Sequence, residues 1–228
     1  MKTVIETINL NKSFGKGDIK VHALNNVSIK ITEGEFTALV GPSGSGKTTL
    51  LNMIGGLDEA DSGQIILNNQ DISLLKKKEM TSFRQKNIGF VFQAYNLIPV
   101  LSAYENAEFV MLLQGISKSE RKERVFKLLQ EVGLEGKENN KPGELSGGQQ
   151  QRVAVVRALA AQPAYILADE PTANLDSKST TDLLDLMYKL NQEENMTFVF
   201  ATHDQRVIDR AKRVIYIDDG KIVKDEIR

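Results

Sequence analysis

The eight residues GPSGSGKT at 41–48 constrain the fold more than any other stretch of the sequence. A continuous apolar run, FTALV at 36–40, precedes them, and a helical pattern that ends at Gly55-Gly56 follows them. The pattern G-x-x-x-x-G-K-[ST] between a buried strand and a helix is typical of a loop that binds nucleotide phosphates. A structural glycine turn before a helix is the alternative interpretation. The sequence therefore predicts an α/β fold in which this loop joins a central strand to a helix.

Each residue type in this loop suits the binding of phosphate. Gly41, Gly44 and Gly46 allow backbone N–H groups to converge on phosphate oxygens, and the N-terminus of the following helix adds a favourable dipole. Lys47 can place its charge on the β- and γ-phosphates, and Thr48 supplies a hydroxyl for Mg²⁺. The candidate phosphate-binding residues are Gly41, Pro42, Ser43, Gly44, Ser45, Gly46, Lys47, Thr48 and Thr49.

Length and charge limit the classes of protein to which the chain can belong. Its 228 residues suit one large domain or two small lobes, and its net charge of −1 lacks the basic excess of nucleic-acid binders. The absence of cysteine excludes disulfides and thiolate metal sites. No apolar run approaches the ~20 residues of a membrane helix. We therefore expect no nucleic-acid partner, and we expect any association with a membrane to go through another subunit.

Strand patterns lie at both ends of the sequence. Strands are expected within the first forty residues and at 87–93, 165–169 and 196–204, and a hairpin that turns at Asp219-Gly220 is expected near the end. Between these strands, helices are expected after the phosphate loop as far as Gly55-Gly56 and around Leu183, Leu186, Met187 and Leu190. The alternation predicts a core with a parallel sheet.

A helical block interrupts this alternation from about residue 95 to residue 160. Ser117 and Glu120 are spaced as a capping box, and Ser146 opens a second clear helix. The block predicts a helical lobe inserted into the core. The expected division is 1–94 and 161–228 for the core with a β lobe, and about 95–160 for the helical lobe.

Two consecutive carboxylates stand at the end of the apolar strand YILAD at 165–169, because Asp169 is its last residue and Glu170 follows it. Asp169 is placed to hold the metal that a phosphate loop requires, and Glu170 is then free to orient or deprotonate an attacking water. An acidic loop that caps the next helix is the alternative interpretation. Together with the phosphate loop, the pair predicts hydrolysis of a nucleotide.

Two polar residues follow other expected strands. His203 should emerge at the same edge of the sheet as Asp169, where it can hydrogen-bond a γ-phosphate, although a lone surface histidine is the usual alternative. Gln93 leads into the helical block and can touch the metal or the attacking water, or it can be a surface glutamine at the end of a strand. The other histidine, His22, has no such support and is interpreted as structural.

LSGGQ at 145–149 is a second glycine-rich turn. Ser146 can cap its helix, while Gly147 and Gly148 leave the backbone donors unobstructed, so the turn can bind an anion. A plain helix cap is the alternative. Since neither a lysine nor a carboxylate pair accompanies this turn, it cannot form a nucleotide site by itself.

Six segments in this order resemble the motifs of the ATP-binding cassette (ABC) ATPases, and the resemblance covers nearly the whole chain. They are GPSGSGKT (Walker A), FVFQ (Q-loop), LSGGQ (signature motif), YILADE (Walker B), EPTANLD (D-loop) and ATHD (H-loop). The resemblance implies an α/β P-loop NTPase core with a parallel sheet, an N-terminal antiparallel β subdomain and an inserted α-helical subdomain. It also implies hydrolysis of ATP with Mg²⁺ as cofactor.

The resemblance assigns roles to the candidate residues. Two copies would pair head to tail, so that LSGGQ of one copy closes on the ATP held by the other and Asp176 lies at their interface. Phe14 would stack on adenine, where tyrosine is more usual in the family. The implied catalytic residues are Glu170, His203, Gln93 and Lys47, the metal ligands are Thr48, Gln93 and Asp169, and the residues facing the partner's ATP are Ser146, Gly147, Gly148 and Gln149.

Within this family the lipoprotein-releasing and macrolide-export type is the most similar group. The segments that carry this likeness are VHALNNVS, LLNMIGGLD, IGFVFQAYNLIPVLSAYEN and LSGGQQQRVAVVRALA. Cell-division ATPases, which regulate without transporting, and bacitracin-sensing exporters share much of the pattern. The resemblance implies permease subunits with extracytoplasmic domains, docking beside Gln93 and residues 94–106, and a location on the cytoplasmic side of the membrane. The cargo cannot be read from the sequence.

Overall fold

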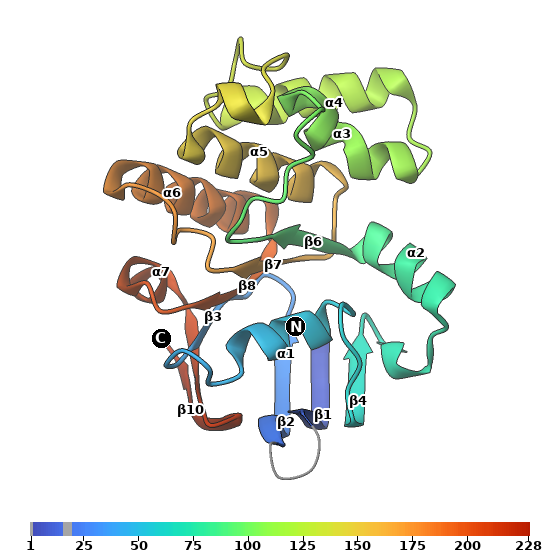
Figure 1. Ribbon diagram of the computed structural model, residues 1–228, viewed down its shortest axis with the longest axis vertical. Helices are drawn as coiled ribbons and strands as arrows, with labels where there is room; N and C mark the ends of the chain where they lie inside the picture. The colour runs from blue at the N-terminus through green and yellow to red at the C-terminus, as the bar shows by residue number, and fades with distance from the viewer. Residues whose placement is uncertain (1, 16–19) are drawn as a thin grey trace.

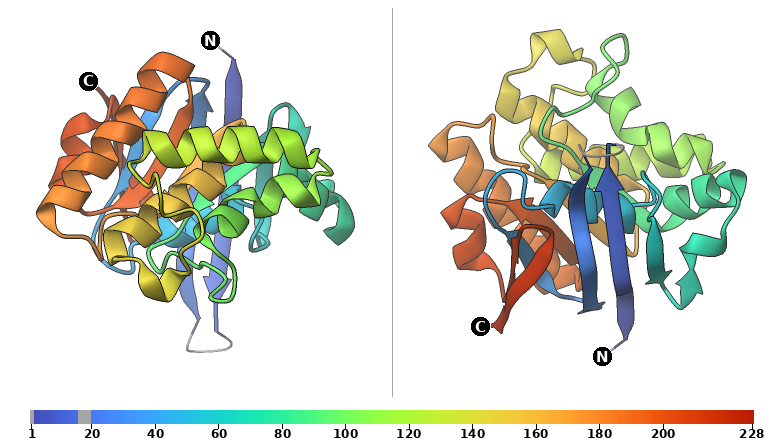
Figure 2. Two further views of the ribbon diagram at one scale, coloured as in Figure 1. Left: turned by 90° about the horizontal axis from the view of Figure 1, so that it is seen from above. Right: turned by 60° about the horizontal axis from the view of Figure 1, so that its bottom comes forward.

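The computed structural model describes residues 2–15 and 20–228, which form two sheets and the helices around them (Figure 1). The smaller sheet is antiparallel and has the strand order β2-β1-β4-β5. Its strands are β1 (Thr3–Phe14), β2 (Val21–Thr32), β4 (Ser62–Leu67) and β5 (Gln70–Asp71). The right-hand view of Figure 2 shows β1, β2 and β4 side by side.

The larger sheet has the strand order β10-β9-β3-β8-β7-β6, and all its neighbours are parallel except β9 and β10. Its strands are β3 (Phe36–Val40), β6 (Ile88–Val91), β7 (Tyr165–Asp169), β8 (Thr197–Thr202), β9 (Arg213–Asp218) and β10 (Lys221–Ile227). The expected hairpin joins β9 to β10, and both turn residues, Asp219 and Gly220, have positive φ. The parallel arrangement places the carboxyl ends of β3, β8, β7 and β6 along one edge.

The helices occupy the connections between the strands. They are α1 (Lys47–Ile54), α2 (Lys77–Asn87), α3 (Ala103–Leu113), α4 (Lys118–Glu131), α5 (Gly147–Ala160), α6 (Ser177–Glu194) and α7 (Gln205–Arg210), with short 3₁₀ turns at Ile72–Leu74 and Pro142–Glu144. Helices α3, α4 and α5 form the upper part of the molecule in Figure 1. The α/β fold with an antiparallel sheet, a parallel sheet and a helical block confirms the expected fold class, while the limits near 95 and 160 remain a prediction.

Serine residues begin three of these helices. Ser102 and Ser146 form complete capping boxes with Glu105 and Gln149. Ser117 caps α4 by accepting a hydrogen bond from the backbone of Glu120, but the Glu120 carboxylate bonds the Ser117 hydroxyl instead of its backbone N–H. The predicted capping box at Ser117 is therefore only half formed.

The larger sheet separates two hydrophobic clusters. Along β7, Ile166 and Ala168 point to the cluster on the side of α5 and α6, and Tyr165 and Leu167 point to the cluster on the side of α1 and the antiparallel sheet. This alternation follows from the two-residue period of a strand. Both faces of β7 are thus buried, as its continuous apolar sequence indicates.

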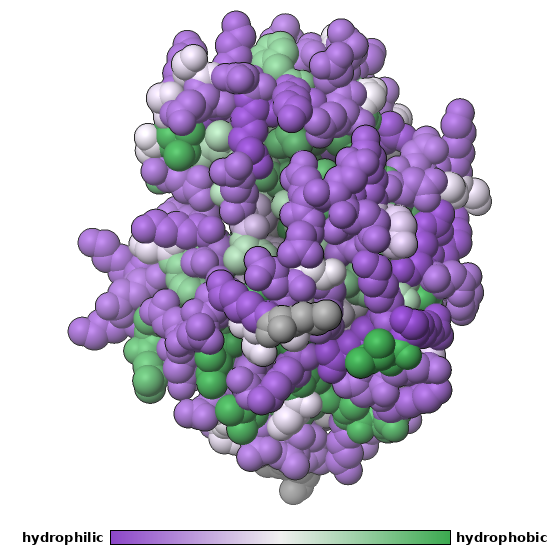
Figure 3. Space-filling view, turned by 180° about the vertical axis from the view of Figure 1, so that it is seen from behind, coloured by the Kyte–Doolittle hydropathy of each residue, from purple (hydrophilic) through white to green (hydrophobic). Residues whose placement is uncertain are grey.

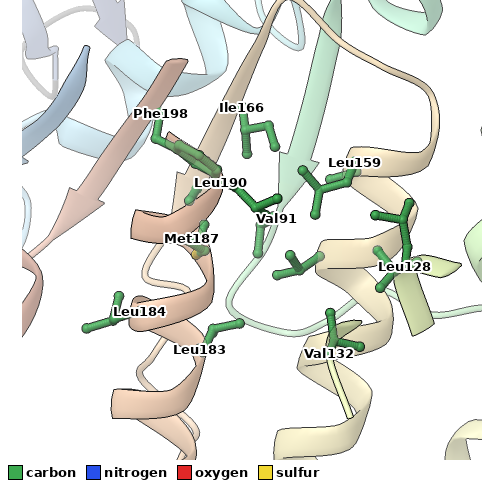
Figure 4. Close-up of a cluster of buried hydrophobic side chains, with 14 of the residues drawn as sticks. Val91, Leu128, Val132, Leu159, Ile166, Leu183, Leu184, Met187, Leu190 and Phe198 are labelled. Carbon is green, nitrogen blue, oxygen red and sulfur yellow. The ribbon is translucent and has the colours of Figure 1, made fainter. Parts of the chain in front are cut away.

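The helical block shares the first of these clusters with the sheet. Leu128 and Val132 at the end of α4 and Leu159 of α5 belong to the same cluster as Ile166 of β7 and Leu183 of α6 (Figure 4). Apolar side chains therefore run without interruption from the helical block to the sheet.

The face opposite to that of Figure 1 is hydrophilic over most of its area, with small separate hydrophobic groups (Figure 3). Among residues 2–15 and 20–228, no helix has the length and apolar character needed to cross a bilayer.

Candidate nucleotide site

The loop between β3 and α1 has a backbone that only glycine accommodates at two points. Gly44 and Gly46 have φ of 80° and 106°, in the left-handed region. A Cβ on Gly46 would lie 2.4 Å from the carbonyl oxygen of Ala23, and one on Gly41 would lie 2.0 Å from that of Ile217. Around Gly44 the space is open for 4 Å. The loop is thus pressed against its neighbours on one side and free to receive a ligand at Gly44.

Lys47 places a positive charge inside this loop. Its side chain folds back to donate to the carbonyl oxygens of Gly41 at 2.8 Å and Pro42 at 2.9 Å, and the residue is only 8% exposed. None of the ion pairs in the described part of the chain includes Lys47. The buried Oγ of Ser45 has no hydrogen-bond partner among the described residues. Within residues 2–15 and 20–228, Lys47 has no carboxylate partner and the Ser45 hydroxyl has no hydrogen-bond partner, so both groups are suited to bind an anionic ligand such as a phosphate chain.

Thr48 and Asp169 meet beside the loop. The Thr48 hydroxyl donates to Oδ1 of Asp169 at 2.9 Å and so joins the start of α1 to the end of β7. Burial and the neighbouring Glu170 raise the pKa of Asp169, whereas the hydrogen bond from Thr48 and the charge of Lys47 act in the opposite direction. Ionisation of Asp169 is unfavourable in these surroundings unless a positive charge lies nearby. The oxygens of Asp169 and Thr48 are therefore suitable ligands for a hard divalent cation.

Glu170 is aimed from β7 toward the end of β8 by an unusual backbone conformation. Its φ is 45°, and its backbone N–H donates to the carbonyl oxygen of Ala201 at 2.9 Å. Its carboxylate accepts from the Thr202 hydroxyl at 3.2 Å, and its Oε1 lies 2.7 Å from Nδ1 of His203. The Glu170 side chain is 16% exposed and that of His203 is 76% exposed, so the histidine covers a largely shielded carboxylate. His203 therefore lies at the same edge of the sheet as Asp169, as predicted, and its contact with Glu170 is a further finding.

Gln93 follows β6, on the other side of β7 from β8. Its backbone carbonyl accepts from Nδ2 of Asn174 at 2.9 Å. Its side chain is exposed and makes no hydrogen bond within the described residues. The structure brings Gln93 to the same edge of the sheet as Asp169 and His203, but it does not bring the Gln93 amide into contact with either of them.

Phe14 ends β1, and the residue is 46% exposed. Nζ of Lys12 lies 5.1 Å from the ring centroid. Within residues 2–15 and 20–228, no hydrogen bond or ring contact joins Phe14 to residues 41–49. The ring is available for stacking, and its role at adenine remains a prediction.

LSGGQ forms the start of α5. The Ser146 hydroxyl accepts from the backbone of Gln149 at 3.3 Å, and the Gln149 side chain accepts from the backbone of Ser146 at 2.9 Å. A Cβ on Gly147 would lie 2.8 Å from the Tyr95 hydroxyl, and one on Gly148 would lie 2.8 Å from the Ser179 hydroxyl. Helix α5 belongs to the upper part of Figure 1 and α1 to the lower part, so one chain keeps its two glycine-rich turns apart.

Two residues that the sequence analysis did not single out also make polar contacts at this edge of the sheet. Gln151 donates to the carbonyl of Pro171 at 2.7 Å, and Thr172 donates to Asp204 at 2.9 Å. Gln151 follows the LSGGQ turn and Thr172 follows Glu170, so nearness to recognised motifs is the signal that could have drawn attention to both. Neither partner could have been inferred, because the contacts depend on the order of the strands.

The sequence profile described as "ABC transporter" matches residues 24–173, which include the phosphate loop, Gln93, LSGGQ and Asp169–Glu170. The chain belongs to the ABC transporter family. This result confirms the resemblance on which the expected roles rest.

Named ABC transporter proteins match nearly all of the chain. The chain is 42% identical to the lipoprotein-releasing system ATP-binding protein LolD of Pseudoalteromonas translucida, covering 98% of this chain and 96% of LolD. It is 47% identical to the macrolide export ATP-binding/permease protein MacB of Hyphomonas neptunium over 97% of this chain, but it spans only 34% of that longer protein.

A solved ABC cassette has nearly the same fold. The dimeric post-hydrolysis structure of the ATP-binding cassette MJ0796, bound to ADP and Pi, superposes with a TM-score of 0.91 and 44% identity, covering 98% of both chains. The corresponding protein comes from Methanocaldococcus jannaschii.

Proposed function

We propose that this chain hydrolyses ATP, with Mg²⁺ as cofactor, as the nucleotide-binding subunit of a membrane ABC complex. The observation that carries the proposal is the position of Glu170 beside Asp169 and within hydrogen-bond distance of His203. A shielded carboxylate next to a phosphate loop suits the orientation or deprotonation of an attacking water.

The residues of the site have separate tasks in this reaction. Lys47 offsets the charge of the phosphates, and the glycines at 41, 44 and 46 expose backbone donors to them. Glu170 accepts the proton of the attacking water, and His203 holds the Glu170 carboxylate in place through Nδ1. Mg²⁺, held by Thr48 and Asp169 with Gln93 nearby, would supply positive charge to the phosphate chain.

We infer further that two copies pair head to tail around ATP. The support is the separation of the LSGGQ turn from the phosphate loop within one chain, together with the dimeric state of the similar cassette MJ0796. An isologous pair would satisfy both anion-binding turns of both copies. Ser146, Gly147, Gly148 and Gln149 would then face the ATP that the partner holds.

The proposed membrane partner is a permease with extracytoplasmic domains, which docks beside Gln93 and residues 94–106 from the cytoplasmic side. The likeness to LolD and MacB supports a role in export or in mechanical transmission across the membrane. A cell-division ATPase that signals without transport is the alternative, and co-purification distinguishes the two. A large permease with an adaptor or lipoprotein carrier would support export. A small membrane subunit with cell-wall hydrolase regulators would support the alternative.

Steady-state ATP turnover by the purified chain, with and without its co-purified partner, tests the enzyme. We expect turnover that requires Mg²⁺ and is lost in Glu170→Gln, which should still bind ATP and accumulate as a dimer in gel filtration. Glu193→Gln, an exposed carboxylate on α6, is the matched control and should behave as the unaltered protein. ATP binding without turnover, even with the membrane partner present, would refute the proposal.

A further inference from the structure

Helix α5 contacts the loop that carries Gln93 on both sides of that residue. We call residues 92–96 the Gln93 loop. Nε2 of Gln151, a fully buried residue at 0% exposure, lies 3.5 Å from the carbonyl oxygen of Phe92 and donates to that of Pro171. The guanidinium of Arg157 donates to the carbonyl oxygens of Tyr95 at 2.9 Å and Asn96 at 2.5 Å. The stronger of these two attachments is the one made by Arg157.

The guanidinium of Arg157 has only backbone carbonyls as hydrogen-bond partners among the described residues. None of the ion pairs formed by the described residues contains it. Burial lowers its pKa, and no carboxylate acts in the opposite direction. Desolvation of a partly buried cation is unfavourable unless well-formed hydrogen bonds offset it, and for Arg157 the carbonyls of Tyr95 and Asn96 provide these bonds.

The two residues whose carbonyls Arg157 binds have an unfavourable backbone conformation. Tyr95 and Asn96 are consecutive non-glycine residues with φ of 56° and 51°. A non-glycine residue is uncommon in the left-handed region, because its side chain crowds its own backbone, and the described residues contain one other consecutive pair, Asn68 and Asn69. The planar guanidinium presents its N–H donors in fixed directions and so fixes the orientation of two neighbouring carbonyls, whereas the donors of a lysine rotate freely. Arg157 therefore stabilises the local shape of the Gln93 loop.

The opposite side of the Gln93 loop contacts the loop after β7. Asn174 donates from Nδ2 to the carbonyl of Gln93 at 2.9 Å and accepts from the Tyr95 hydroxyl at 3.4 Å. The same hydroxyl lies so close to Gly147 that a Cβ there would approach it to 2.8 Å. The Gln93 loop is thus hydrogen-bonded to α5 on one side and to the segment that follows Glu170 on the other. In Figure 1 the connection from β6 to α3 runs past α5.

We propose that Arg157 is a positioning residue that fixes the Gln93 loop to α5, so that Gln93 and the LSGGQ turn move as one body. This inference rests on the proposed function, in which Gln93 lies near the metal and the attacking water. Since Arg157 does not touch residues 41–49, its removal should leave ATP binding to the phosphate loop nearly unchanged. It should instead slow the chemical step, because Gln93 is no longer held in register with the nucleotide.

Backbone hydrogen exchange of the ligand-free full chain tests the attachment without any turnover. In Arg157→Met we expect amides 93–97 to exchange at least about tenfold faster, the loss expected for hydrogen bonds from a charged group. Arg124→Met is the matched control, because Arg124 also donates to two neighbouring carbonyls, those of Leu159 and Ala160, and burial also lowers its pKa. The control should change exchange near the end of α5 and leave 93–97 as in the unaltered protein.

Kinetics provide the second readout. In Arg157→Met we expect kcat for MgATP to fall by about tenfold or more, with KM within about threefold of the unaltered value. The kcat of Arg157→Lys should lie between those of Arg157→Met and the unaltered protein. The lysine variant also serves as the test if the methionine variant does not fold. Unchanged exchange at 93–97 in a folded variant, or a raised KM at unchanged kcat, would overturn the inference. A lack of turnover in the unaltered protein would instead refute the proposed function, and the exchange result would still decide the attachment.

Discussion

Asp169 and Glu170 are adjacent residues of the same charge in different surroundings. Asp169 accepts a hydrogen bond from Thr48, and burial together with the charge of Glu170 raises its pKa. Glu170 turns away from it through a left-handed backbone and pairs with His203. The two carboxylates therefore face different neighbours, which suits one for a cation and the other for a water molecule.

Asp169→Asn should leave the ligand-free protein at least as stable as the unaltered chain at pH 7. The folded state binds the Asp169 proton more tightly than the unfolded state, so the free energy of unfolding falls as the pH rises from about the ordinary value of 3.8 through the raised pKa. Asparagine does not titrate, so the variant does not lose this stability as the pH rises. The difference in the free energy of unfolding between the two proteins should vanish near pH 3, where Asp169 is protonated. Thermal unfolding between pH 3 and pH 8 measures it.

The same variant should gain less stability from Mg²⁺ with a non-hydrolysable ATP analogue, because it lacks the carboxylate expected to hold the metal. Asp209→Asn, an exposed aspartate on α7, is the control and should gain as much as the unaltered protein. Equal stabilisation of Asp169→Asn and the unaltered chain by Mg²⁺ and the analogue would contradict the assigned role.

At the scale of elements, α7 begins at a carboxylate that also ties it to the loop after Glu170. Asp204 caps the helix, bonds Arg206, and accepts from the Thr172 hydroxyl. The hydrogen bonds from Arg206 outweigh the effect of burial and lower the pKa of Asp204 to about 2.

Asp204→Asn should lower the free energy of unfolding above pH 4, where the aspartate is ionised in both the folded and the unfolded state. The folded pKa lies below the ordinary value of 3.8, so the stabilisation is lost as the pH falls from about 4 through 2. Urea unfolding of both proteins across this range should show curves that converge in acid. A difference independent of pH would indicate a packing effect and refute the electrostatic account.

Helices α3 and α4 are joined by a largely buried ion pair. Glu108 lies 2.7 Å from Nε of Arg121 and accepts from the Tyr104 hydroxyl at 2.8 Å; burial and this hydrogen bond raise the pKa of Tyr104 to about 12. Arg121→Met should cost about 3 kcal/mol in the free energy of unfolding, because Glu108 is left without its cation. Glu108→Leu in the same chain should recover part of the loss. Urea unfolding measures both, and equal stability of the single variant and the unaltered protein would show that the pair contributes nothing.

The elements also show which parts of this structure a sequence can predict. The phosphate loop, β7 and the β9–β10 hairpin could be predicted, because their residue patterns are local and each position has a direct steric or hydrophobic reason. Helix α2 was not predicted, since its sequence is mostly polar and buries only Phe83. The φ of 45° at Glu170 and the contacts of Gln151 could not be predicted either. They depend on the order β8-β7-β6, which no local pattern encodes.

At the scale of the whole molecule, each chain keeps the phosphate loop and the LSGGQ turn apart, and we propose that they form halves of two different ATP sites. If two copies pair head to tail, Lys47→Met and Ser146→Arg should each be inactive alone, because each defect is present in both sites of a symmetric dimer. A mixture should recover turnover, since a mixed dimer has one site with both defects and one site with neither. ATPase assays at a fixed total concentration and varied ratio measure this recovery. A mixture as inactive as its components would contradict the head-to-tail arrangement.

The hydrophobic cluster shared by the helical block and the sheet limits which fragments of the chain can fold alone. Leu128, Val132 and Leu159 belong to the same cluster of side chains as Ile166 and Leu183, so the core of the helical block is continuous with that of the sheet. A fragment of residues 95–160 made alone would expose one side of that cluster to water and should remain unfolded. Engineers who build chimaeras between relatives would therefore need to exchange the helical block together with the surfaces of β7 and α6 that complete its packing.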